Sequence, residues 1–426
     1  MASATPHPAR TIDLALAGLD RLSSATGEPA ALLERRHVAG ALLAGMTLPS
    51  RSLHLWKYTD PGRFVPSSDP TGGTLEAVTE AWHDNAPHAA TAVIAGGAVR
   101  SIELSDEARR AGVVVTDLHR SAPLDLLGTA VPDGHGFVEA LNAAAWRGGV
   151  LVRVPRGVRL EQPVRVRSVA PATGTALPRI LVVAEPGSEF EVLESHVGGG
   201  SGTLSLTVAE ILVGEGAQVR YDLIQRWEDG VVGHHTARAR VAARGRFQLA
   251  LASFGGAVYK ADVGAILAGE HAEAETYGVA MGGGNQHFDH HTEHLHDSPD
   301  TRSNLDFKVA LTDRSRSAYT GMIRIAPAAA RCEAYQENRN LLLSEDARAE
   351  SIPELEILNE DVRCSHGATV APLDEEQLFY LKSRGLPHNQ AMRLIVYGFL
   401  DQTLARLPEA TRERLEALVA ARLHAN

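Results

Sequence analysis

Cys364 and His366 form the short motif of this sequence that is best suited to metal binding or thiol chemistry. They stand two residues apart in Cys364-Ser-His-Gly-Ala-Thr-Val370. In a strand, alternate residues share a face, so the thiol and the imidazole would lie side by side with Cα atoms about 6.6 to 7 Å apart. Both groups could then bind one soft or borderline metal ion, or the imidazole could lower the pKa of the thiol. Two ligands leave such a site incomplete, so others must come from elsewhere in the chain or from another subunit.

The plain alternative for this motif is a buried cysteine beside a structural histidine. The other cysteine, Cys332 in Arg331-Cys-Glu-Ala-Tyr335, has no neighbour of that kind and is interpreted as inert packing. Two cysteines are too few for a disulfide framework or an all-thiolate zinc site. Thiol chemistry in this chain therefore depends on one or two reduced groups assisted by histidine.

A second candidate is the segment from His287 to Asp297, which holds five histidines and three carboxylates in eleven residues. In an extended strand, one face would carry Phe288, His290, Thr292, His294 and His296, and the other would carry His287, Asp289, His291 and Glu293. Imidazole and carboxylate are ligands for zinc or ferrous iron, so His290, His294 and His296 are candidate metal ligands. The zincin spacing is absent. The alternative is a ladder of polar strand residues that hydrogen-bond to one another or lie at a subunit contact.

Composition and charge narrow the class of protein. The 426 residues are 44% hydrophobic and 22% charged, as in ordinary globular proteins. The net charge of −11 argues against binding to nucleic acid or to an anionic membrane surface. No stretch approaches the roughly 18 apolar residues of a spanning helix, and the first ten residues lack a basic-then-apolar leader. We expect a cytoplasmic protein with no membrane or nucleic-acid partner.

The elements that must position these residues are short strands. From about Gly149 apolar and polar residues alternate with a period of two, and this pattern continues for about two hundred residues. Three copies of a recurring unit place Gly187, Gly216 and Gly245 at intervals of 29 residues. A strand repeat of this length without intervening helices favours a parallel β-helix, and a β-sandwich is the alternative.

Helical patterns flank this region. We expect an N-terminal helical region over 1–70, a small α/β region over 71–148, the parallel β-helix over 149–373 and a C-terminal helical domain over 374–426. The last of these begins with Asp374-Glu-Glu-Gln377, which has the form of a helix capping box. Because a terminal coil exposes an apolar cross-section and unpaired strand edges, we expect these helices to cap the end of the solenoid.

Several separated motifs of the C-terminal half closely resemble the SufB/SufD family of iron–sulfur cluster assembly proteins. They are Asn338-Arg-Asn-Leu-Leu-Leu-Ser344, Pro353-Glu-Leu-Glu-Ile357, Asp361-Val-Arg-Cys-Ser-His-Gly-Ala-Thr-Val370, Leu373-Asp-Glu-Glu-Gln-Leu-Phe-Tyr-Leu381 and Ser383-Arg-Gly385. The Cys-Ser-His-Gly-Ala-Thr form and the early Trp56-Lys-Tyr-Thr-Asp60 resemble the SufD branch more than the SufB branch. Two departures are Ala371-Pro372, where the family usually has Gly and a variable residue, and Cys332, which matches no family ligand.

The resemblance implies a right-handed parallel β-helix between helical end domains. It also implies a scaffold complex with SufB and the ATPase SufC, which receives sulfur and iron, builds a cluster and passes it on. The family's SufD-side histidine falls on His366, with Cys364 beside it, and both would face SufB. The C-terminal helices resemble the surface that contacts SufC, and the residues we expect to bind a partner there are Leu378, Phe379, Leu381, Arg384, Leu394 and Phe399.

The leading hypothesis is therefore a non-catalytic scaffold subunit that pairs with SufB and binds SufC. A transient iron–sulfur cluster or iron is expected at the SufB interface, and no cofactor in the isolated chain. Flavin binding by the complex and self-association of the isolated chain as a homodimer are left open. Two alternatives are a β-helix enzyme acting on polysaccharide and a stand-alone metal-binding protein that uses the histidine segment.

Overall fold

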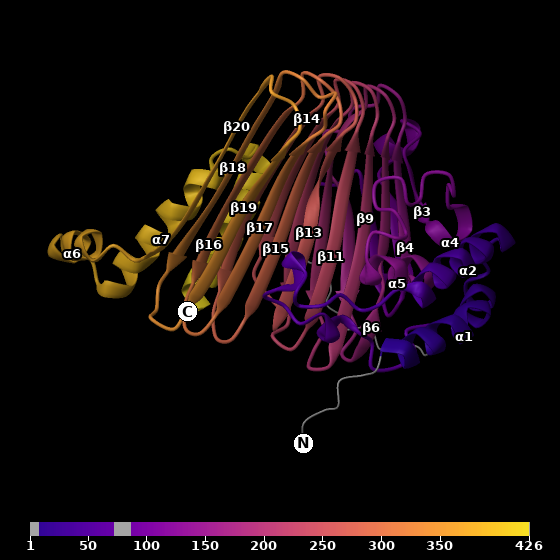
Figure 1. Ribbon diagram of the computed structural model, residues 1–426, viewed down its shortest axis with the longest axis horizontal. Helices are drawn as coiled ribbons and strands as arrows, with labels where there is room; N and C mark the ends of the chain where they lie inside the picture. Colours follow the sequence, from indigo (N-terminus) through magenta and orange to yellow (C-terminus); the bar gives the residue numbers. More distant parts are fainter. Residues whose placement is uncertain (1–7, 72–86, 426) are drawn as a thin grey trace.

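The fold is a parallel β-solenoid flanked by helices at both ends of the chain, in agreement with the predicted fold class (Figure 1). The computed structural model describes residues 8–71 and 87–425. Residues 1–7 and 72–86 of the two predicted N-terminal regions, and residue 426 of the C-terminal domain, lie outside the described residues. The solenoid consists of two long sheets that face each other, and the chain passes from one sheet to the other in every coil.

The first sheet contains ten strands. Its order is β2 (Ala98–Leu104), β1 (Ala90–Ala95), β5 (Val164–Ala170), β8 (Glu189–Gly198), β10 (Gln218–Trp227), β12 (Arg246–Ser253), β14 (Glu273–Gly282), β16 (Arg302–Leu311), β18 (Cys332–Leu342) and β20 (Val362–Pro372). All neighbours are parallel except β1 and β2. We call it sheet A.

The second sheet, sheet B, faces the first. Its order is β19 (Arg348–Ile357), β17 (Arg316–Ile325), β15 (His287–His296), β13 (Val258–Leu267), β11 (Val232–Val241), β9 (Thr203–Val213), β7 (Arg179–Ala184), β4 (Gly149–Val154) and β3 (Val114–Asp117), with β6 (Gly174–Ala176) also paired to β9. Only β3 and β4 run antiparallel. The strands β1 to β3 come from the predicted α/β region, so that region continues the two sheets of the solenoid.

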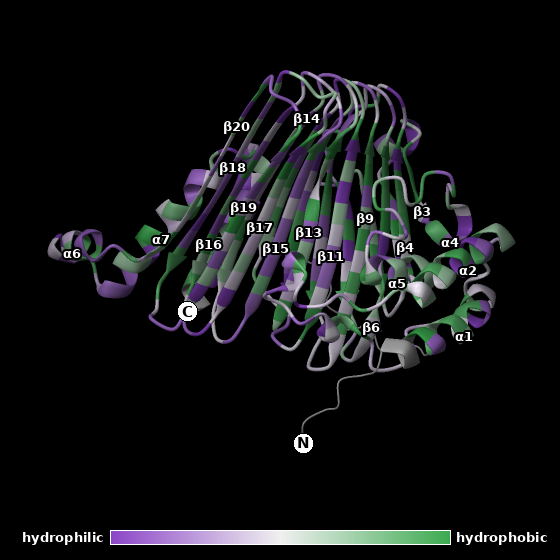
Figure 2. Cartoon of the chain, in the orientation of Figure 1, coloured by the Kyte–Doolittle hydropathy of each residue, from purple (hydrophilic) through white to green (hydrophobic). Residues whose placement is uncertain are grey.

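The alternation read from the sequence becomes the inner and outer faces of the coils. Inward side chains such as Val192, Leu223 and Leu251 are fully buried in one core between the sheets. Bands of hydrophobic and hydrophilic residues alternate along the strands in Figure 2. Burial of these inward side chains removes apolar surface from water in every coil. Each Å² of apolar surface buried contributes roughly 25 cal/mol to the stability of the stacked coils.

The predicted glycine repeat marks a column of left-handed turns at one rim. Gly187 and Gly216 have positive φ angles of 72° and 64°, and their amides donate to carbonyls of the following coil. The third predicted member, Gly245, is not in the column: Arg244, with φ of 58°, takes that place. The reason is coil length. Gln218 pairs with a residue 29 positions earlier in β8 but only 28 positions later in β12.

The C-terminal helices do not cap the solenoid, and our expectation that they would is wrong. These helices are α6 (Glu375–Ser383), α7 (His388–Leu404) and α8 (Glu409–Ala425). The apolar sides of α7 and α8 pack on the outer face of sheet A, with Leu400 and Val419 buried against outward residues such as Ala252 and Met281. Helix α6 has no buried residue and projects away from the sheets (Figure 1). Asp374 is its N-cap, as predicted, and accepts hydrogen bonds from the amides of Glu376 and Gln377.

The N-terminal helices other than α3 (Asp106–Arg110), whose Ala108 is buried in the core between the sheets, lie on the outer side of sheet B. The helical elements before the solenoid are α1 (Pro8–Thr26), α2 (Ala30–Gly45), the short 3₁₀ turns η1 (His54–Trp56) and η2 (Pro61–Phe64), α3, α4 (Leu118–Ser121) and α5 (Phe137–Ala145). Leu19, Phe64 and Leu141 are buried with outward residues of β9 and β13. None of the described helices is long and apolar enough to span a membrane.

Candidate functional site

Cys364 and His366 lie on β20, the last strand of sheet A. In the parallel register of β18 and β20, Ala334 pairs with Cys364 and Gln336 pairs with His366. Ala334 and Gln336 are buried inward residues, so the thiol and the imidazole also point to the inner side of the solenoid. No later coil covers this side, and His366 is therefore exposed while Cys364 is half-buried. The two predicted residues share one face at an open end of the stack.

The surroundings of Cys364 favour the protonated thiol. Burial raises the pKa of the Cys364 thiol, and Cys332 nearby raises it further. The alternative in which the neighbouring imidazole lowers the thiol pKa is thus not supported by this arrangement. Cys332 is fully buried under the last coil and lies 3.1 Å from the Thr301 hydroxyl, as expected for a packing residue. Both cysteines are free thiols.

The remainder of the open end is mostly apolar. Strand β19 is the last strand of sheet B, and its inward positions follow from the register with β17, in which Ile323 pairs with Leu355 and Ile325 with Ile357. Ile357 and Val370 keep 40% and 44% of their surface exposed, because none of the described residues packs fully over them. The end of the solenoid therefore offers two unpaired strand edges, a ring of apolar side chains, one thiol and one imidazole.

The histidine segment is strand β15, and its two faces are those predicted. The inward histidines are fully buried, and each one bonds to hydroxyl groups. His290 lies 2.9 Å from Ser253 Oγ, His294 lies 3.0 Å from Thr276 Oγ1, and His296 lies 2.7 Å from Thr301 Oγ1 and 2.8 Å from Ser303 Oγ. Burial lowers the pKa of His290 and His296 to about 4 and that of His294 to about 3, so all three rings are neutral.

These three histidines do not converge on one point in the structure. The described residues contain two groups of three metal-ligating side chains whose ligand atoms lie within 4.8 Å of one another, and neither group includes His290, His294 or His296. Their contacts are those of the hydrogen-bonded ladder that we considered as the alternative.

The outward face of β15 bonds to neighbouring strands of sheet B and, through His287, to the N-terminal segment. Its pairs are His287 with Thr59 (2.8 Å), Asp289 with Lys260 (3.0 Å), His291 with Asp262 (2.8 Å) and Glu293 with Arg238 (2.8 Å). A pocket of about 790 Å³ lies beside this network, between residues 45–56, the start of α5 and the outer face of sheet B. Asp262 also accepts from His135, and this hydrogen bond raises the pKa of His135.

The residues predicted to bind a partner separate into two groups. On α6, Leu378 and Leu381 are partly exposed and Phe379 is 72% exposed, so this helix presents an apolar side to solvent. Arg384 follows α6 and places its guanidinium 5.2 Å from the centre of the Tyr380 ring. On α7, Leu394 is exposed. Phe399, in contrast, packs on the outer face of sheet A within the chain.

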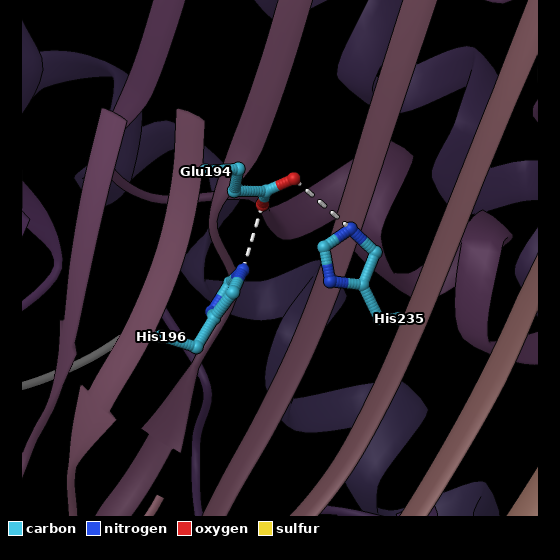
Figure 3. A group of neighbouring side chains, drawn as sticks. All are labelled: Glu194, His196 and His235. Atoms are coloured by element: carbon cyan, nitrogen blue, oxygen red, sulfur yellow. Dashed lines mark hydrogen bonds and ion pairs between the residues drawn. The ribbon is translucent and has the colours of Figure 1, made fainter. Parts of the chain in front are cut away.

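Our sequence reasoning missed a cluster in the interior of the solenoid. Glu194 and His196 of β8 meet His235 of β11, and all three side chains are fully buried (Figure 3). The signal in the sequence was a Glu-x-His pair in a strand, followed by the His-His pair of β11. Only the coil register shows that these residues come together across the two sheets.

Comparisons with known proteins agree with this architecture. Residues 167–399 match the family model described as the SufBD core domain of SUF-system FeS cluster assembly. An iron-sulfur cluster assembly SufBD family protein of Staphylococcus saprophyticus is 30% identical over 283 residues, which cover 66% of this chain and 61% of the relative. Proteins of the same description from Staphylococcus epidermidis and Staphylococcus aureus are 29% identical over the same length. The match thus spans about three fifths of the length of these curated relatives.

Proposed function

The chain belongs to the SufBD family of iron–sulfur cluster assembly proteins, and from this premise we propose that it is a non-catalytic scaffold subunit that pairs with SufB and binds the ATPase SufC. One observation carries the proposal: the last coil, which bears Cys364 and His366, is left uncovered. The two free cysteines also suit a reducing compartment such as the cytoplasm.

The open end has the properties of an interface. Strands β19 and β20 leave one row of backbone groups on each sheet without a neighbouring strand. Natural proteins seldom leave such edges exposed, because they pair readily with another chain. A partner with strand edges of its own would continue both sheets and cover Ile357 and Val370. In our proposal this partner is SufB, with a second copy of the same chain as the alternative occupant.

Such a junction would place Cys364 and His366 between two subunits. Thiolate and imidazole are ligands for iron, and the partner would supply the remaining ligands of a cluster or of iron held there as cargo. Because the pKa of the Cys364 thiol is raised, its proton would leave only when a metal or a sulfur donor arrives.

Helix α6 is the part of the chain that we assign to SufC. It stands clear of the sheets and exposes Phe379 and Tyr380, while α7 and α8 anchor it to the outer face of sheet A. Large exposed aromatic residues are typical of protein contacts. Movement of SufC would be passed through these helices to the sheet that ends in β20.

The pairing is tested by a charge placed on the open end. Val370→Asp puts a carboxylate on the inward apolar side of β20, whereas the control Thr369→Asp puts it on the outward side. Burial of an unpaired charge costs several kcal/mol, so Val370→Asp is expected to abolish co-purification with SufB and leave SufC binding intact. Retained SufB binding by this variant would contradict the proposed interface.

The role of the two ligands is tested in the assembled complex. We expect His366→Ala and Cys364→Ser to lower the yield of cluster formed by the complex with SufB and SufC. The matched control, Ser365→Ala, changes the residue between them, which points outward. An unchanged cluster yield in both variants, with the complex intact, would remove the site from the proposal.

A further inference from the structure

The interior of the solenoid contains one carboxylate, that of Glu194, among inward side chains that are otherwise apolar, neutral polar or histidine. Glu194 lies on the inner side of β8, and its side chain is fully buried between the two sheets. Along strands β8 to β18 it is the one inward position that carries Asp, Glu, Lys or Arg. A carboxylate buried without a compensating positive charge costs several kcal/mol. This position therefore calls for a cation.

Two imidazoles approach the same carboxylate (Figure 3). His196 Nε2 lies 2.7 Å from Glu194 Oε1, and His235 Nε2 lies 3.5 Å from Glu194 Oε2. The phenol of Tyr221 donates a hydrogen bond of 2.6 Å to Oε2, which orients the carboxylate in the way that groups around a metal site orient its ligands. All of these side chains are fully buried.

The hydrogen bonds within the cluster leave His235 unsatisfied. Within residues 8–71 and 87–425, neither ring nitrogen of His235 has a hydrogen-bond partner, and Nδ1 of His196 has none either. A buried polar atom without a partner costs about 1 to 3 kcal/mol.

We propose that Glu194, His196 and His235 bind one divalent first-row transition cation, with zinc as the expected ion, inside the solenoid. The 3.5 Å between Glu194 Oε2 and His235 Nε2 is close to the roughly 3.4 Å that separates two ligands of a tetrahedral ion with bonds of about 2.1 Å. The 2.7 Å between Glu194 Oε1 and His196 Nε2 is a hydrogen bond, so these two atoms would move apart when the ion replaces the shared proton. Two imidazoles and one carboxylate suit zinc or ferrous iron. The ion would supply the missing positive charge and would join β8 of sheet A to β11 of sheet B.

This site is independent of the proposed function, because it lies in the core and shares no residue with the open end. Its role would be structural: a metal that binds only the folded chain stabilises the fold. Since the three residues are buried, the ion would enter as the chain folds.

The test is refolding of the full chain. The protein is unfolded in denaturant with a chelator, desalted and refolded with or without zinc, and bound metal is measured by elemental analysis after a second desalting. We expect one equivalent of zinc in the wild type and a higher thermal midpoint than in the metal-free protein. Glu194→Gln, which keeps the shape of the side chain, is expected to lose that equivalent. His290→Asn, which removes another buried inward histidine, is the matched control and should keep it.

Cobalt provides a measurement that needs no variant. Refolding with Co²⁺ should give the visible absorption of an ion bound by nitrogen and oxygen, without the charge-transfer band of a thiolate ligand. A thiolate band would place the ion at a cysteine, and no bound metal would leave only the hydrogen-bonded cluster. Either result, or an unchanged metal content in folded Glu194→Gln, would overturn the proposal.

Discussion

Replacement of His294 by glutamine should remove part of the acid sensitivity of this protein. His294 is fully buried on the inner side of β15, where its Nε2 bonds to the Thr276 hydroxyl and its Nδ1 has no partner in the part of the chain that the structure describes. Burial, together with the nearby His296 ring and the positive charge of Arg238, lowers the pKa of His294 to about 3. The ring is therefore neutral in the folded protein throughout the ordinary pH range.

The size of the effect follows from the difference between the folded and unfolded chains. An unfolded histidine has a pKa of about 6.5, so below that pH the unfolded chain binds a proton that folded His294 does not. The free energy of unfolding is thus highest above about pH 6.5 and falls as the pH drops towards 3. Between about pH 7.5 and pH 5 the expected loss from this one side chain is about 2 kcal/mol.

The measurement is urea unfolding at these two pH values for the wild type and for His294→Gln. The substitution costs some stability at both pH values, but the variant should lose about 2 kcal/mol less than the wild type when the pH is lowered. All other titrating groups are common to both proteins, so their contributions cancel in this comparison. His388→Gln, at the exposed start of α7, is the control and should behave as the wild type. Equal pH dependence in the His294→Gln variant and the wild type would refute the reasoning.

Three further substitutions test the packing of the layers by denaturant unfolding or hydrogen exchange. Leu400→Ala, in the fully buried side of α7, should lower the free energy of unfolding by about 2 to 5 kcal/mol, and a loss below about 1 kcal/mol would contradict the docking of this helix on sheet A. Arg179→Ala should lower the free energy of unfolding by about 3 to 5 kcal/mol. In the wild type the guanidinium lies 2.7 Å from the carboxylate of Glu210, and the substitution leaves that carboxylate buried without its cation. His135 has a raised pKa through its bond to Asp262, so that bond stabilises the fold below about pH 6.5 and weakens as the pH rises above it. In His135→Gln the protection of backbone amides from hydrogen exchange in the segment before α5 should therefore change less with rising pH than in the wild type. Identical pH profiles of protection in the two proteins would contradict the stabilising role of the His135–Asp262 bond.

The local pattern of the sequence was sufficient for the strands and their faces. The alternation in 287–296 placed His290 and His291 on opposite faces of the strand, as the structure has them, because a strand has a period of two whatever its neighbours are. The spacing of Gly187 and Gly216 likewise revealed the coil, since a left-handed turn favours glycine. Both signals act within one strand or one turn.

Relations between distant segments could not be read in this way. The apolar sides of α7 and α8 were visible in the sequence, but nothing in an amphipathic helix says which surface it will cover, and the end of the solenoid was the wrong choice. The cluster of Glu194 and His235 joins residues from opposite sheets, and their meeting depends on the lengths of the intervening turns. The open-end position of Cys364 and His366 was expected from the incomplete ligand set and not from the strand order.

The rim of the solenoid shows where its stability could be increased without touching the interior. After Gly216 the left-handed column is continued by Arg244, His271, Asp300 and Arg331, each with φ near 60°. A residue with a Cβ atom pays roughly 1 kcal/mol or more for this conformation, and glycine does not. The early coils therefore turn without strain, whereas each later coil stores a small cost at the same corner. Glycine at these four corners would relieve that cost while leaving every inward side chain of the coils unchanged.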